Sequence, residues 1–114
     1  MYYYSLRISI SDKGQIDQLN RILEIESNYP EVGWGIEIIK ENSNIDFNFA
    51  DYFLSILNGK EAELKAVNIS TDNISIWVLY EYEGQCNLEF TPTDLKRFGD
   101  AGISLCISCW EKQQ

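Results

Sequence analysis

The 114-residue chain contains no histidine, and this absence removes most of the usual routes to catalysis. Histidine is the side chain whose unperturbed pKa lies near neutral pH, and it is the usual general base and the commonest metal ligand. Without it, the Ser-His and Cys-His arrangements that activate a nucleophile cannot form. We therefore expect a protein that is not an enzyme and that has no catalytic residues, metal ion or cofactor.

Cysteine is also scarce, with only Cys86, Cys106 and Cys109. An odd number of cysteines cannot pair completely within one chain, and it fits a reducing compartment. Cys106 and Cys109 have the spacing of a metal-binding pair, but the surrounding residues 103–110 have the pattern of a strand. Positions three apart on a strand point to opposite faces, and no second pair could complete four zinc ligands. We expect buried or half-buried thiols.

Long apolar runs are missing as well, since no stretch approaches eighteen uninterrupted apolar residues. The N-terminal residues show no basic region followed by an apolar run and a small-residue cleavage site. These observations predict a cytoplasmic protein without membrane contact. The length and an apolar content of 45% predict one folded domain over residues 1–114.

The hydrophobic periodicity predicts an alternating series of strands and helices. Period-two alternation predicts strands over residues 2–11, 32–40, 74–82, 86–90 and 103–110. Helical spacing of apolar residues predicts helices over residues 15–27 and about 49–58, a shorter helical turn over 60–67, and a helix that begins at Thr91-Pro92 and runs through Phe98. The Glu83-Gly84 pair between two of the strands predicts a hairpin.

The predicted order is therefore β-α-β-α-β-β-α-β, and the fold class is α+β. Alternating strands and helices often form a doubly wound parallel sheet. Here, the period-two strands and the direct hairpin favour a mainly antiparallel sheet of about five strands with helices on one face. The expected architecture is a two-layer sandwich.

Negative charge is the most prominent property that the sequence does have. Eighteen Asp and Glu against nine Lys and Arg give a net charge of -9. Residues 17–51 contain eight acidic and two basic residues, and residues 66–95 contain five acidic residues and no basic one. A negative field repels the phosphate backbone of nucleic acids and attracts basic proteins. We expect a basic protein partner and no direct binding of nucleic acid, although acidic composition also serves solubility alone.

Aromatic residues near these carboxylates define the candidate binding site. Tyr3, Trp77 and Trp110 are expected on the face opposite the core, and an aromatic side chain rimmed by carboxylates is typical of a protein-binding hot spot. The candidate partner-binding residues are Glu37, Trp77, Glu81, Glu83 and Glu89. In the predicted hairpin, Glu81 and Glu89 face each other or nearly so. Such a pair is typical of a solvated sheet face, and an acid-base enzyme that uses a carboxylate pair remains an alternative.

Three segments also resemble a known group of proteins. These are the strand at residues 4–8, the helix at residues 52–57 and, above all, the closing part from Leu88 to Ile107, with a helix opened by Thr91 and a glycine before the last strand. They resemble a family of small bacterial domains of unknown function. Small acidic domains of this kind are similar to immunity proteins, which neutralise toxins delivered between competing bacteria. The resemblance implies an inhibitor role.

Together these features lead to one hypothesis and one main alternative. The hypothesis is a non-catalytic binding protein, an immunity protein that occludes the surface of a basic toxin such as a nuclease. The alternative is a structural or regulatory domain that self-associates through its sheet, for example as a homodimer. The two differ in the salt sensitivity of the complex that they form.

Overall fold

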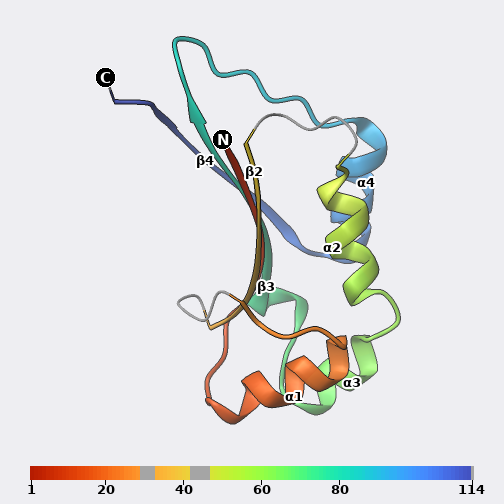
Figure 1. Cartoon of the computed structure of the whole chain (residues 1–114). Coiled ribbons are helices and arrows are strands. Elements are labelled where there is room, and N and C mark those ends of the chain that lie inside the picture. The colour runs from red at the N-terminus through yellow and green to blue at the C-terminus, as the bar shows by residue number, and fades with distance from the viewer. Residues whose placement is uncertain (29–32, 42–46, 114) are drawn as a thin grey trace.

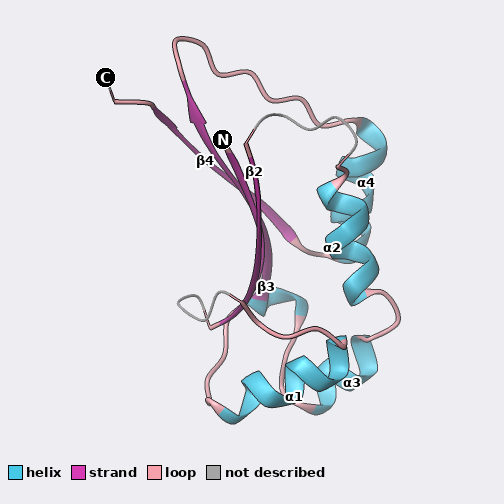
Figure 2. Cartoon of the chain, in the orientation of Figure 1, coloured by secondary structure: helices cyan, strands magenta, loops and turns pink. Residues whose placement is uncertain are grey.

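The chain folds into one sheet with helices packed against one side and one end of it (Figure 1, Figure 2). The computed structural model describes residues 1–28, 33–41 and 47–113. In these residues the elements are β1 (Tyr2–Ile8), α1 (Gly14–Leu23), β2 (Trp34–Lys40), α2 (Phe49–Leu57), α3 (Glu61–Ala66), the 3-10 helix η2 (Thr71–Asn73), β3 (Ile74–Tyr82), α4 (Pro92–Ala101) and β4 (Ser104–Glu111). The predicted α+β class is confirmed. Val32, where the second strand was expected to begin, lies outside the described residues.

The sheet has four strands in the order β2-β1-β3-β4. Strand β1 pairs antiparallel with both β2 and β3, whereas β4 runs parallel to β3. The sheet is therefore mixed, and the expectation of about five mainly antiparallel strands needs correction. A parallel neighbour requires a crossover connection, and α4 lies in the connection between β3 and β4.

The predicted hairpin over residues 74–90 is wrong. Strand β3 forms as expected, but residues 85–91 connect it to α4 without secondary structure. The reason lies in the sheet order, because β1 occupies one edge of β3 and β4 occupies the other. The alternating residues 86–90 are left without a strand to pair with.

Local capping signals place α4 where the sequence predicted it. The Thr91 hydroxyl accepts a hydrogen bond from the Asp94 backbone N–H at 3.2 Å, and Pro92 begins the helix. Gly102 closes the helix in the left-handed region, with φ of 69°. None of the helices in the described parts of the chain is long and apolar enough to cross a membrane.

Helix α1 is shorter than predicted and stops at Leu23 instead of continuing to residue 27. Glu24 adopts a left-handed conformation, with φ of 58°, which turns the chain back toward β2. The residues that follow then bond to other parts of the fold. The Ser27 backbone N–H donates to Asn20 Oδ1 at 3.0 Å, and the Asn28 N–H donates to the Gly35 carbonyl at 2.9 Å. These bonds replace the helical hydrogen bonds of the predicted last turn.

The hydrophobic core lies between the sheet and the helices. Alternate residues of the central strands, such as Leu6, Ile8 and Ile76, are fully buried, and they pack with Phe53 of α2 and Leu19 of α1. This arrangement follows from the period of two along each strand and the period of 3.6 along each helix. The other residues of each strand point to the opposite face of the sheet.

Candidate functional site

The face of the sheet turned away from the core has no helix packed on it in the described parts of the chain (Figure 1). We call it the open face. Because the strands are in register, their side chains form rows across this face. The open face consists of Gly35, Glu37 and Ile39 from β2, Tyr3, Ser5 and Arg7 from β1, Ser75, Trp77, Leu79 and Glu81 from β3, and Ser104, Cys106, Ser108 and Trp110 from β4.

A polar and aromatic row crosses the middle of the open face. Ser5 lies between Glu37 and Trp77 as the direct partner of both residues. The Arg7 guanidinium lies 4.4 Å from the centre of the Trp77 ring, and Arg7 Nε donates a hydrogen bond to Ser5 Oγ at 3.0 Å. Trp77 Nε1 donates to Ser75 Oγ at 2.9 Å. These contacts hold the Trp77 ring in one orientation, with Ser5 of β1 between it and Glu37 of β2.

A second aromatic group occupies the end of the open face near the C-terminus. Trp110 remains 38% exposed, and its Nε1 donates a hydrogen bond to Glu81 Oε2 at 3.3 Å. The Tyr3 ring stacks on the Trp110 ring with centroids 6.2 Å apart. Ile39, at the β2 side of the Tyr3 row, is 53% exposed. This end of the face therefore combines exposed apolar surface with one carboxylate held against an indole.

The structure brings together three of the five predicted binding residues. Glu37, Trp77 and Glu81 all lie on the open face. Glu83 and Glu89 lie instead in the connection between β3 and α4, and both are exposed. Glu81 and Glu89 do not face each other across a hairpin, because residue 89 belongs to no strand. The candidate site is smaller than predicted and is centred on β1, β3 and the end of β4.

Sequence reasoning missed several members of this face. Ile39 and Leu79 already alternated with core residues, so the period of two assigned them to the outward side of their strands. Their contribution to one surface became visible only with the strand order. Arg7 and Ser5 were expected on a polar face, yet Ser5 is completely buried. The neighbouring Trp77 and Arg7 side chains account for that burial.

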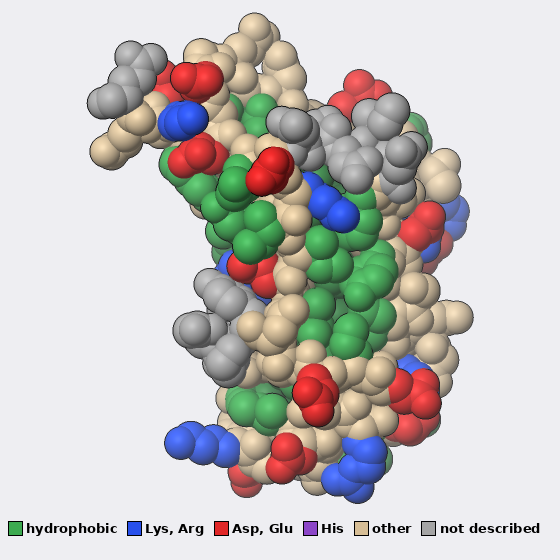
Figure 3. Space-filling view, viewed as in Figure 1, with side chains coloured by type: hydrophobic (Ala, Val, Ile, Leu, Met, Phe, Trp, Pro, Cys, Tyr) green, Lys and Arg blue, Asp and Glu red, His purple; other side chains and the backbone are tan. Residues whose placement is uncertain are grey.

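Negative charge is spread over the molecule and is not confined to the open face. In the space-filling view, acidic and basic side chains are interspersed (Figure 3). Some are neutralised locally, since Lys96 binds Asp100 at 2.7 Å and Arg97 bridges to Asp51 and Asp94. The two acidic segments of the sequence contribute to helices as well as to strands. The open face itself carries the carboxylates of Glu37 and Glu81 and the guanidinium of Arg7.

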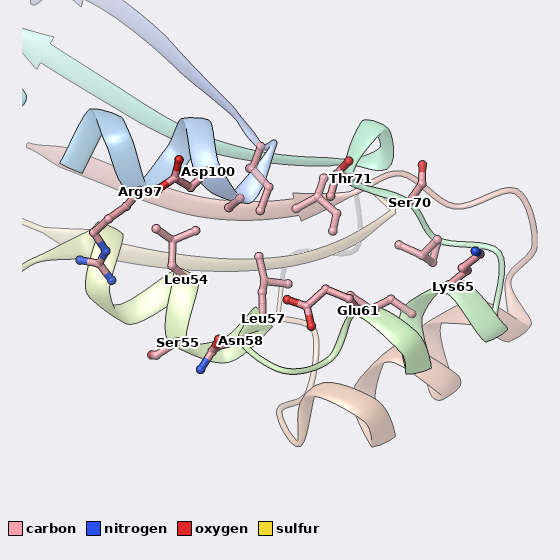
Figure 4. A pocket seen from close by; sticks show the side chains of 15 residues that line it. Leu54, Ser55, Leu57, Asn58, Glu61, Lys65, Ser70, Thr71, Arg97 and Asp100 are labelled. Atoms are coloured by element: carbon pink, nitrogen blue, oxygen red, sulfur yellow. The ribbon is translucent and has the colours of Figure 1, made fainter. Parts of the chain in front are cut away.

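The structure also contains a groove on the helical side, with a volume of about 760 Å³. Leu54 and Leu57 of α2 point into it, and charged groups such as Glu61, Lys65 and Arg97 stand at its rim (Figure 4). Further aliphatic residues line it, namely Leu64, Ile69, Ile74, Ala101 and Ile103. The groove offers apolar burial, but its lining has no arrangement of groups that selects a particular reaction or ligand.

The cysteines are free thiols, and the structure separates the pair with metal-like spacing. Cys106 lies opposite Trp77 on the open face, whereas Cys109 lies opposite Tyr80 on the side of the helices. Among the residues that the structure describes, no group of three or more His, Cys, Asp or Glu side chains is placed to hold a metal ion. The expected opposite orientation of these two thiols is confirmed, but Cys109 is exposed and not buried or half-buried as expected.

Comparisons of the chain with protein-family models, with curated proteins and with solved structures found no match. The resemblance to small bacterial immunity domains therefore stays a prediction from the sequence. The candidate site must be interpreted from its own chemistry.

Proposed function

We propose that this chain is a non-catalytic protein-binding domain that docks a basic protein on its open face. The observation that carries this proposal is the row that runs from Glu37 through Ser5 to Trp77, together with Trp110 bound to Glu81, on a face that no helix of the described residues covers. Protein interfaces are enriched in Trp and Tyr, and their energetic centre is usually an aromatic anchor in a desolvated patch. The open face offers two indoles, and one of them, Trp110, donates a hydrogen bond to a carboxylate.

The expected partner follows from the charge of the protein. Steering by opposite charge raises association rates, and a net charge of -9 favours positively charged partners. The carboxylates of Glu37 and Glu81 flank the aromatic surface and can pair with lysine or arginine side chains of the partner. Ile39 and Leu79 contribute apolar area that such a partner would cover.

Among basic partners, we propose a toxin, with this chain as its immunity protein. A toxin that degrades nucleic acid needs a cationic surface to hold phosphate groups. A negatively charged protein that covers this surface blocks the substrate without any chemistry of its own. The absence of histidine and the uncovered aromatic face are both compatible with an occluding inhibitor.

The test uses the basic protein encoded next to this gene, with binding measured by titration calorimetry at low and at high salt. We expect a complex whose affinity falls as salt rises. Replacing both open-face carboxylates, Glu37→Gln and Glu81→Gln, should weaken it by on the order of tenfold. Trp110→Ala should weaken it by about 1–2 kcal/mol, as expected for an aromatic anchor.

The matched control is the double variant Glu61→Gln and Glu63→Gln. It removes the same amount of negative charge from α3, which is not part of the open face. This variant should retain nearly the full affinity. An equal loss in both double variants would show that net charge, and not the open face, determines binding. The absence of any complex with the neighbouring basic protein would remove the immunity assignment.

A further inference from the structure

The two edge strands of the sheet, β2 and β4, differ in the hydrogen bonds that other residues make to their outer edges. The outer edge of β2 is covered by the segment after α1. Gly35 N–H donates to Ser27 Oγ at 3.0 Å, and Glu37 N–H donates to Asn28 Oδ1 at 2.7 Å. The Gly35 carbonyl accepts from the Ser27 hydroxyl at 2.9 Å and from the Asn28 N–H at the same distance, and the Glu37 carbonyl accepts from Asn28 Nδ2 at 3.2 Å. Side chains and backbone of Ser27 and Asn28 therefore cover this edge at Gly35 and Glu37.

Strand β4 has no comparable cover in the described part of the chain. Its backbone pairs with β3 along one edge, and no turn, loop or side chain among the described residues donates to or accepts from its other edge. The strand is also well exposed, with Ile107 at 45% and Trp110 at 38%. The outer edge of β4 presents free N–H and C=O groups over Ser104–Glu111.

The composition of β4 also lacks the usual protection of an edge strand. From Ser104 to Trp110 it contains no charged residue, no proline and no glycine, whereas β2 carries Glu37 and Lys40. Natural proteins use charges, proline or a covering segment to prevent edge strands from pairing with other chains. A long strand without these features is a template for another strand. The free backbone N–H and C=O groups of this edge can pair with the backbone of another β-strand.

We propose that β4 pairs with β4 of a second copy of this chain in antiparallel orientation. The two four-stranded sheets then join into one continuous sheet around a twofold axis. An axis perpendicular to the sheet at Ile107 keeps the core sides of the two copies together and sets Ile107 opposite the same residue of the second copy. Leu105 then lies opposite Cys109, and Ser104 lies opposite Trp110. The exposed Ile107 side chains become covered, and the two open faces lie on the same side of the dimer.

The negative net charge of each chain does not concentrate at the proposed contact. The charged residue at the end of β4 is Glu111, and the antiparallel register places the two copies of it at opposite ends of the paired strands. Successive residues of a strand advance by about 3.4 Å, so these carboxylates lie more than two Debye lengths apart at physiological salt. The uncharged segment forms the centre of the contact, where like charges would oppose association most strongly.

The experiment is light scattering coupled to size-exclusion chromatography, over about a hundredfold range of protein concentration and with reductant present to prevent disulfides between chains. We expect a mass that rises toward twice the 13.2 kDa of one chain. Ile107→Lys places two ammonium groups face to face at the axis, and it should raise the dimer dissociation constant by at least about tenfold. Ser104→Lys provides a second variant at an exposed position of the same strand.

The matched control is Ile39→Lys on β2, where the side chain is also exposed but the strand edge is covered two residues away, at Glu37. This variant should dimerise like the unchanged chain, and circular dichroism should show that all variants fold. A chain that stays monomeric throughout the concentration range overturns the proposal. So does a dimer that survives both β4 variants, or one that Ile39→Lys abolishes.

Discussion

The indole nitrogen of Trp110 in β4 donates a hydrogen bond to Oε2 of Glu81 in β3 at 3.3 Å. The two residues are also direct neighbours in the parallel register of these strands. Tyr3 from β1 stacks on the same indole, so three strands contribute to one corner of the open face. Each carboxylate oxygen can accept more than one hydrogen bond, so Glu81 retains acceptor capacity for a partner. The fold thus fixes a negative group against an exposed aromatic ring.

The first prediction separates a binding tryptophan from a structural one. Trp110→Ala should lower the free energy of unfolding by less than about 1 kcal/mol, because much of the ring is exposed. Trp34→Ala should lower it by about 3–5 kcal/mol, because Trp34 is completely buried in the core. Urea denaturation measures both values. A loss at Trp110 as large as that at Trp34 would mean that the exposed indole serves stability and not recognition.

The second prediction concerns the polar contact that holds Trp34. Asn20 Oδ1 accepts a hydrogen bond from Trp34 Nε1 at 2.8 Å and another from the Ser27 N–H at 3.0 Å. Asn20→Ala should destabilise the protein by about 1–3 kcal/mol, because the buried indole N–H loses its acceptor.

The control for this prediction is Gln18→Ala, at an exposed position of the same helix, which should change the free energy of unfolding by less than about 0.5 kcal/mol. Combining Asn20→Ala with Trp34→Phe provides a further comparison. Trp34→Phe removes the unsatisfied donor, so the two changes together should cost less than the sum of the single effects. Strict additivity would contradict a direct contribution from this hydrogen bond.

Structural features that depend only on residues close together in the sequence were predicted correctly. The alternation of Tyr4, Leu6 and Ile8 placed these side chains in the core, and all of them are buried. The Thr91-Pro92 start of α4 was correct because a cap needs only residues within one helical turn. The outward position of Trp77 followed from the same alternation within β3. These features are encoded in a few adjacent residues.

Features that depend on pairing between distant segments were not predictable in this way. Residues 86–90 alternate like a strand, but they remain irregular because β4 occupies the edge of β3 that a hairpin would have used. Without the hairpin, Glu81 and Glu89 do not face each other as predicted. The cover that Ser27 and Asn28 provide for β2 was also missed, because Ser27 was assigned to the end of a helix and Asn28 to no element. Hydrophobic period identifies a strand but does not identify its neighbour.

The third prediction tests the turn that leads into β2. Gly33 has a φ of 100°, and a Cβ atom at this position would lie 2.8 Å from the Ile8 carbonyl oxygen. Gly33→Ala should therefore destabilise the protein by about 1–3 kcal/mol. Gly99 in α4 has open space around it, and Gly99→Ala should stabilise the helix by about 0.5–1 kcal/mol. Thermal unfolding of the two variants should shift in opposite directions, and a shift in the same direction would contradict the turn geometry.

The fourth prediction concerns stability at alkaline pH. Burial, followed by a hydrogen bond and charge interactions with Tyr80, raises the pKa of Tyr2 to about 12 from its ordinary value of 10.0. The two rings are stacked with centroids 4.3 Å apart. Between these pH values the unfolded chain loses the Tyr2 proton while the folded chain keeps it. The contribution of this group to stability is therefore fully present below pH 10.0 and is lost as the pH rises toward 12.

Tyr2→Phe removes the ionisable group and should reduce this alkaline loss. The variant is expected to show a shallower fall in the free energy of unfolding between pH 10.0 and about 12, measured by urea denaturation at a series of pH values. Tyr52→Phe is the matched control, because it removes a tyrosine hydroxyl from an exposed position on α2, outside the stacked pair. The outcome that contradicts the prediction is an equal fall in the free energy of unfolding with pH for the Tyr2 variant and the unchanged chain. It would mean that the stacking of Tyr2 on Tyr80 does not hold the Tyr2 proton in the folded state.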